Sequence, residues 1–226
     1  RQRQMCIRDR GKENVIKAGF KKFNFKELSL KEQLSKSNHF FNLLNDRRSI
    51  REFSDREIPT EVIENIIKSA STAPSGAHKQ PWVFCVVQSK DVKQKIRAAA
   101  EKEEYENYHG RMSDEWLNDL KKFGTNWNKP FLEIAPALIV VFKKTYDIED
   151  GDKSKNYYVN ESVGIATGIL LSAIQNAGLV SLTHTPSPLN FLSEVLARPI
   201  NEKPYLLIPI GYPKKDTQVP ILKRKG

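Results

Sequence analysis

The stretch Arg47-Arg48-Ser49-Ile50-Arg51 places three guanidinium groups and one hydroxyl group within five residues, just before the first regular α/β part of the sequence. A guanidinium group stays ionised at any relevant pH, and its planar fork matches the geometry of phosphate oxygens. The cluster is therefore typical of a site for a phosphate monoester. A solvated basic turn is the alternative, and the cluster alone favours neither. Residues elsewhere in the chain must decide between them.

The net charge does not indicate a nucleic-acid partner, although the 226 residues carry a formal charge of +10. Residues 1–25 contain eight basic and two acidic side chains, so they supply +6 of that charge. The rest of the chain carries only +4, which is not a strongly positive surface. A hydrophobic content of 39% and a charged content of 28% fit a globular protein, and the length favours one domain.

The first 25 residues are expected to be a basic tail, disordered or partly non-native, and residues 26–226 to form the folded domain. The tail does not begin with Met and joins no pattern downstream. The chain as given has no signal peptide and no apolar stretch long enough for a bilayer, so we expect a soluble, cytoplasmic protein without a membrane partner. Cys6 and Cys85 cannot make a disulfide framework, and the four histidines show no ligand spacing, so no metal site is expected.

Hydrophobic patterning predicts both helices and strands. Helices are expected over residues 28–45, from residue 60 to the break at Ala73-Pro74-Ser75-Gly76, and over residues 160–178. Apolar, β-branched runs predict strands at residues 82–88, 137–143, 179–183 and 205–210, and such strands between helices indicate a sheet covered on both faces. Residues 160–178 are apolar or small nearly all round, which fits either a central helix or the spine of a dimer interface.

Three further segments accompany the basic cluster along the chain. Thr72-Ala73-Pro74-Ser75-Gly76-Ala77-His78 lies between a helix and a strand, Thr183-His184-Thr185-Pro186 follows a strand, and Lys223-Arg224-Lys225 lies near the C-terminus. The first of these, taken alone, is best interpreted as an ordinary turn. Together with Arg47-Arg48-Ser49-Ile50-Arg51, the three resemble the flavin-binding signature of the FMN-dependent nitroreductase superfamily.

Within that superfamily the closer resemblance is to the iodotyrosine deiodinases, and residues 101–129 carry it. This segment contains, in order, residues 101–108, Arg111-Met112, Asp119-Leu120-Lys121-Lys122 and Thr125-Asn126-Trp127-Asn128-Lys129. This order and spacing is similar to the substrate lid of the deiodinases. The resemblance covers roughly residues 45 to 225, nearly the whole folded body.

The residue types in the lid segment suit an amino-acid zwitterion. Glu104 and Tyr108 are four residues apart, so on a helix they project from one face, and Lys129 arrives from a later turn. Glu104 would bind the ammonium group, and Tyr108 and Lys129 the carboxylate. A solvated, charged helix is the alternative that these residues alone favour, because the segment is rich in Glu and Lys. The family resemblance favours ligand binding.

The resemblance implies FMN as the cofactor. The implied cofactor contacts are Arg47, Arg48, Ser49, Arg51 and Arg224 at the phosphate and ribityl chain, and Pro74, Ser75, Gly76, Thr183, His184 and Thr185 along the flavin. The N–H of Ala77 would donate to the phenolate oxygen of the substrate. Thr185 would be the catalytic residue, because a hydroxyl group near flavin N5 favours one-electron transfer over hydride transfer. The run Thr183-His184-Thr185 departs from the three threonines of animal deiodinases, and His184 is either a tolerated replacement or a group behind the flavin contacts.

The implied protein is an FMN-dependent reductive dehalogenase of halogenated tyrosines, with an α+β nitroreductase-like fold, a mixed β-sheet flanked by helices, and a domain-swapped homodimer. Its electron donor would be an NAD(P)H-linked reductase or an unknown source. One rival is a general NAD(P)H-dependent nitroreductase or flavin reductase, and another is the flavin-fragmenting enzyme that makes the lower ligand of cobalamin. A non-catalytic flavin-binding or halotyrosine-binding module and a basic nucleic-acid binder are rivals of another class.

Overall fold

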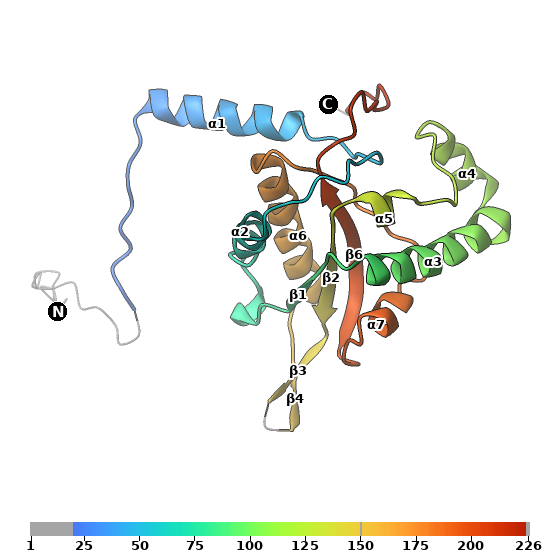
Figure 1. Ribbon diagram of the computed structural model, residues 1–226. Helices are drawn as coiled ribbons and strands as arrows, with labels where there is room; N and C mark the ends of the chain where they lie inside the picture. Colours follow the sequence, from blue (N-terminus) through green and yellow to red (C-terminus); the bar gives the residue numbers. More distant parts are fainter. Residues whose placement is uncertain (1–19, 150, 225–226) are drawn as a thin grey trace, which may run out of the picture. The chain divides into compact units, whose positions relative to one another are not determined.

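The structure, a computed structural model, describes residues 20–149 and 151–224 (Figure 1). The sequence predictions for Cys6, Lys225 and residues 1–19 lie outside these residues. The chain divides into two units, which meet between Phe40 and Phe41. Helix α1 (Leu30–Asn45) crosses this boundary, and none of its residues is buried. Phe20, Phe23 and Phe25, which precede α1, are also exposed.

The second unit contains most of the helices and all strands of the described chain. Its α-helices are α2 (Thr60–Ala70), α3 (Lys90–Glu106), α4 (Asp114–Lys121), α5 (Phe131–Ile134), α6 (Val159–Asn176) and α7 (Phe191–Val195). Its strands are β1 (Trp82–Val87), β2 (Ala137–Lys144), β3 (Tyr146–Glu149), β4 (Asp152–Lys155), β5 (Val180–Ser181) and β6 (Glu202–Gly211). Within residues 20–149 and 151–224, no helix has the length and the hydropathy that crossing a membrane requires.

Four strands form the main sheet in the order β1-β2-β6-β5, and all of their ladders are antiparallel. Val86 of β1 lies opposite Ile139 of β2, and Ile139 lies opposite Ile208 of β6. One parallel bridge joins Ser49 to Ser181 at the β5 edge, which makes the sheet mixed. The basic cluster is thus attached to this edge of the sheet. Strands β3 and β4 form a separate hairpin.

Helices cover both faces of the sheet, as the patterning predicts (Figure 1). Ile139 and Val141 of β2 belong to the core cluster under α2 and α6, whereas Leu138 and Val140 belong to the cluster under α3, α5 and α7. Successive side chains of a strand point to opposite faces, so one fully buried strand supplies both cores. Each fully buried aliphatic side chain contributes about 1.5–3 kcal/mol.

The predicted strands are confirmed, with shifted ends: β5 is only two residues long, and β6 begins at Glu202 rather than at residue 205. The β3–β4 hairpin was missed, because Asp152–Lys155 is polar and carries no strand pattern. Helix α6 packs on the sheet through buried Val163, Ala166 and Leu170. Ile165, on the other side of α6, is 47% exposed. Ile165 is therefore an apolar side chain of α6 that the described residues leave about half exposed.

Candidate functional site

The predicted phosphate ligands line one small cavity at the β5 edge of the sheet. We call this cavity, about 170 Å³ in volume, the phosphate site, and its walls include Arg47, Arg48, Ser49, Arg51 and Arg224. Lys223 lines it as well, and no carboxylate is among the described residues of its wall. Five cationic side chains without an acidic neighbour are suited to bind a dianionic phosphate monoester.

Local backbone contacts hold the walls of the phosphate site together. The N–H of Ile50 donates to the carbonyl of Ser181 at 3.1 Å, which fixes the basic cluster to the sheet. The guanidinium group of Arg48 donates to the carbonyl of Pro220, and that of Arg224 to the carbonyl of Asn45 at 2.9 Å. The C-terminal segment and the basic cluster, far apart in sequence, thus form one site.

The structure also brings together the three predicted substrate residues Glu104, Tyr108 and Lys129, which we call the clamp. The Lys129 ammonium group lies 3.2 Å from a carboxylate oxygen of Glu104, and both side chains are at least 92% buried. The same ammonium group lies 5.3 Å from the centre of the Tyr108 ring. Glu104 and Lys129 therefore form a buried ion pair within the clamp.

Burial shifts the pKa values of two residues of the clamp, Lys129 and Tyr108. It lowers the pKa of Lys129, an effect that the nearby carboxylate of Glu104 opposes. Burial also raises the pKa of Tyr108, although a hydrogen bond with Thr125 works in the opposite direction. Thr125 accepts a hydrogen bond from Lys129 at 3.2 Å as well. Thr125 therefore joins two members of the clamp, a role that sequence reasoning missed although it lies in the predicted lid segment.

Thr183, His184 and Thr185 continue β5 along the edge of β6, where His184 pairs with Leu207 through both backbone groups. Thr183 and Thr185 are exposed and His184 is buried, as expected from the alternation of an extended strand. The ring of His184 packs edge-on against Phe131 at 5.4 Å. The structure thus places His184 behind the face that carries Thr185.

His184 is held in the neutral form. Burial, together with the positive charges of Lys129 and Arg51, lowers its pKa to about 3. Its Nε2 atom is buried and has no hydrogen-bond partner within the described chain. A third positive charge beside Lys129 and Arg51 would be unfavourable, so a neutral imidazole fits this position.

The remaining predicted site residues, which are the flavin contacts Pro74 to Gly76 and the substrate contact Ala77, form a strained turn. The N–H of Gly76 donates to the hydroxyl oxygen of Ser162 at 3.3 Å, and the Ser75 hydroxyl accepts from the N–H of Gln80 at 2.9 Å. A Cβ atom on Gly76 would lie 2.8 Å from the carbonyl oxygen of Tyr157, so this position requires glycine. Ala77 has a φ of +48°, a conformation that costs a non-glycine residue about 1 kcal/mol or more and that is found at functional sites.

This turn and the phosphate site lie at opposite ends of α6. Gly76 contacts Ser162 in the first turns of α6, whereas Ser49 pairs with Ser181, beyond its last residue. The α-helical rise makes Ser162 and Asn176 about 20 Å apart. Figure 1 shows the turn between α2 and β1 near one end of α6 and the tip of β6 towards the other. A single chain does not bring Ser75 to Ala77 up to the phosphate site.

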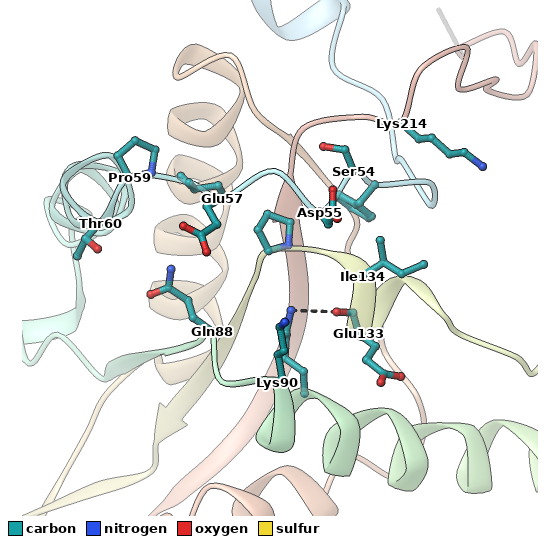
Figure 2. Close-up of a pocket in the computed structure, with 14 residues that line it drawn as sticks. Ser54, Asp55, Glu57, Pro59, Thr60, Gln88, Lys90, Glu133, Ile134 and Lys214 are labelled. Atoms are coloured by element: carbon teal, nitrogen blue, oxygen red, sulfur yellow. Dashed lines mark hydrogen bonds between the residues drawn. The ribbon is translucent and has the colours of Figure 1, made fainter.

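A larger cavity, of about 1310 Å³, lies elsewhere in the second unit and contains none of the predicted site residues (Figure 2). Its lining mixes carboxylates such as Glu57 and Glu133 with Lys90 and Lys93. Lys93 donates to the carbonyls of Glu133 and Ala135 at 2.9 and 2.8 Å. Its charge therefore stabilises the end of α5, and we assign this cavity no role in the chemistry.

The fold and the phosphate site together define a protein of the nitroreductase class. The sequence pattern of the Nitroreductase family matches residues 44–212, and the chain belongs to this family. Within it, the chain is a homologue of the iodotyrosine deiodinases. It is 65% identical to the iodotyrosine deiodinase of Haliscomenobacter hydrossis over 195 residues, which cover 86% of this chain and 88% of that protein. It is 50% identical to human iodotyrosine deiodinase 1 over 217 residues, which cover 94% and 73%.

Solved structures agree with this assignment. The crystal structure of oxidised iodotyrosine deiodinase bound to FMN and 3-iodo-L-tyrosine superposes with a TM-score of 0.72 at 30% identity, over 83% of this chain and 96% of that one. A BluB-like flavoprotein from Clostridium difficile 630 superposes with a TM-score of 0.58 over 88% of this chain and 96% of that one. Its 23% identity reflects the shared fold alone. The predicted family is thus confirmed.

Proposed function

We propose that this protein is an FMN-dependent reductive dehalogenase that converts halogenated tyrosines to tyrosine. The observation that carries the proposal is the buried pair of Glu104 and Lys129 beside Tyr108. A negative and a positive group at this spacing suit the ammonium and carboxylate groups of an amino acid. A general nitroreductase has no need of such a pair. The high identity to two iodotyrosine deiodinases supports the same activity.

The residues present fit FMN. The phosphate site offers five cationic side chains without an acidic neighbour, and its small volume suits a phosphate group. When bound, FMN would supply the reducing electrons, one at a time. Arg47, Arg48 and Arg224 would hold its phosphate. Thr185 presents its hydroxyl group on the exposed side of the β5 edge, where it would contact the flavin.

The substrate would bind by replacing the ion pair between Glu104 and Lys129 with its own contacts to these two residues. Its ammonium group would take the place of Lys129 at Glu104, and its carboxylate would bind Lys129 and Tyr108. The N–H of Ala77 would donate to the phenolate oxygen. The overall reaction breaks the carbon–halogen bond, forms a carbon–hydrogen bond, consumes two electrons and one proton, and releases a halide ion. The lid segment would exclude water from this site. An NAD(P)H-linked reductase is the proposed source of electrons.

A domain-swapped homodimer is the second part of the proposal. The predicted flavin residues lie at two ends of α6, and this separation supports a site to which two chains contribute. The exposed side of α6 at Ile165 offers an apolar surface for a second copy. Phe20, Phe23 and Phe25 are also exposed, and their burial against a partner would favour the swap.

The proposed activity is tested by turnover of the purified, FMN-loaded protein with dithionite. We expect iodide release from 3-iodotyrosine and little reduction of nitroaromatic compounds. Steady nitroaromatic reduction without iodide release would assign the protein to the general nitroreductases instead. Loss of the flavin itself with consumption of oxygen would identify the flavin-fragmenting rival.

The two-chain site predicts complementation between two inactive variants. Arg48→Gln damages the phosphate site, and Gly76→Val places its side chain against the Tyr157 carbonyl at the other end of α6. Each variant alone is expected to bind little FMN at a concentration that saturates the wild type. After the two are mixed and exchanged, one site of every heterodimer is intact, so about a quarter of the sites should bind FMN. If Arg48 and Gly76 of the same chain contributed to the same site, mixing the two variants would restore no FMN binding.

A further inference from the structure

Phe123 belongs to the lid segment, yet it forms part of the wall of the phosphate site. Its half-buried ring lies 5.6 Å from the guanidinium carbon of Arg51, which faces the same cavity. A cation within about 6 Å of an aromatic face is attracted by the ring. The lid segment thus contacts the cofactor-binding residues through a defined pair of side chains.

Arg51 lines two cavities. It lines a second cavity, of about 210 Å³, together with Thr125 and Phe131. The charge of Arg51 is close enough to Tyr108 to affect the pKa of that phenol. Arg51 therefore lies between the phosphate site and the clamp.

The chain from Phe123 onward leads directly to the clamp. Gly124 has a φ of +59°, so the turn after Phe123 needs glycine, and the next residue, Thr125, bonds to Lys129 at 3.2 Å. Because only Gly124 lies between Phe123 and Thr125, a displacement of the backbone at Phe123 would also displace Thr125. The contact series runs from the phosphate site through Arg51 and Phe123 to Thr125 and Lys129.

We propose that Phe123 is a positioning residue that couples FMN binding to amino-acid binding. Bound phosphate would fix Arg51, the ring of Phe123 would pack on the fixed guanidinium group, and Thr125 would then hold the clamp in place. Such coupling is reciprocal, so an amino-acid ligand must tighten FMN binding by the same factor by which FMN tightens ligand binding. The inference rests on the proposed function.

The test measures FMN affinity of the full-length protein with and without saturating 3-iodotyrosine, in the absence of a reductant so that no turnover occurs. Free FMN is separated by ultrafiltration and measured by its absorbance. For the wild type we expect 3-iodotyrosine to lower the FMN dissociation constant by about 5-fold or more. In Phe123→Ala, the FMN dissociation constants measured with and without 3-iodotyrosine should agree within about twofold, while FMN still binds through the arginines.

Trp116→Ala is the matched control, because Trp116 is an exposed aromatic residue of the same lid segment that does not line the phosphate site. In the Trp116→Ala variant, 3-iodotyrosine should lower the FMN dissociation constant by the same factor as in the wild type. The inference is overturned if 3-iodotyrosine lowers the FMN dissociation constant of Phe123→Ala by the same factor as that of the wild type. It is also overturned if the wild type binds both ligands but neither changes the affinity for the other. A wild type that binds no FMN or no 3-iodotyrosine instead overturns the proposed function. A purely structural role of Phe123 would weaken FMN binding equally with and without 3-iodotyrosine and would also count against the proposal.

Discussion

Replacement of Glu104 by Gln is expected to weaken 3-iodotyrosine binding about 30-fold or more, while FMN stays bound. The side chain of Glu104 is 92% buried, so its charge is little screened by water. Removal of one partner of a buried charge pair costs about 2–5 kcal/mol, and every 1.4 kcal/mol is a factor of ten. A neutral amide of the same shape cannot balance the substrate ammonium group, and it leaves Lys129 without its partner in the free protein.

The measurement is a titration of the FMN-loaded variant with 3-iodotyrosine, followed by quenching of flavin fluorescence. Glu103→Gln is the matched control, because Glu103 is the adjacent residue on α3 and pairs with Arg111 at 2.6 Å, outside the clamp. The control should bind 3-iodotyrosine as the wild type does. Equal affinities of the Glu104→Gln variant and the wild type would remove Glu104 from the substrate site. The absorbance of bound FMN reports whether each variant has folded.

The clamp illustrates how far sequence reasoning reaches. The spacing of Glu104 and Tyr108 predicts that both project from one helix face, and both do lie next to Lys129. No periodicity relates Lys129 to them, since Lys129 lies 25 positions after Glu104, and only the family resemblance named it. Their mutual ion pair could not be predicted, because it depends on how the lid segment folds back over α3.

The predicted flavin contacts show what the sequence alone does not predict. The family resemblance implies a domain-swapped homodimer, but the distance between Gly76 and the basic cluster within one chain follows only from the length of α6 and the contacts at its two ends. Sequence order carries no information on that distance. Phe123 was missed for another reason: a single aromatic residue among lysines has no pattern, and its contact with Arg51 arises only from tertiary packing.

Replacement of Arg48 by Gln is expected to weaken FMN binding about 100-fold but to leave riboflavin binding nearly unchanged. A hydrogen bond to a charged group contributes about 1.5–3 kcal/mol, and Arg48 faces a cavity in which every charged side chain among the described lining residues is positive. Riboflavin lacks the phosphate group, so it does not benefit from that charge. The ratio of the two affinities therefore isolates the contribution of Arg48 to phosphate binding from any general loosening of the site.

Calorimetric titration of the apoprotein with FMN and with riboflavin measures both affinities. Arg56→Gln is the control, since Arg56 belongs to the same segment but stacks on Tyr212 at 4.0 Å, away from the phosphate site. It should leave the ratio of FMN to riboflavin affinity as in the wild type. If Arg48→Gln weakened both ligands equally, its main role would be the hydrogen bond to the Pro220 carbonyl, which holds the C-terminal wall of the cavity. A loss confined to FMN requires that the guanidinium group act on the phosphate itself, because the two ligands differ nowhere else.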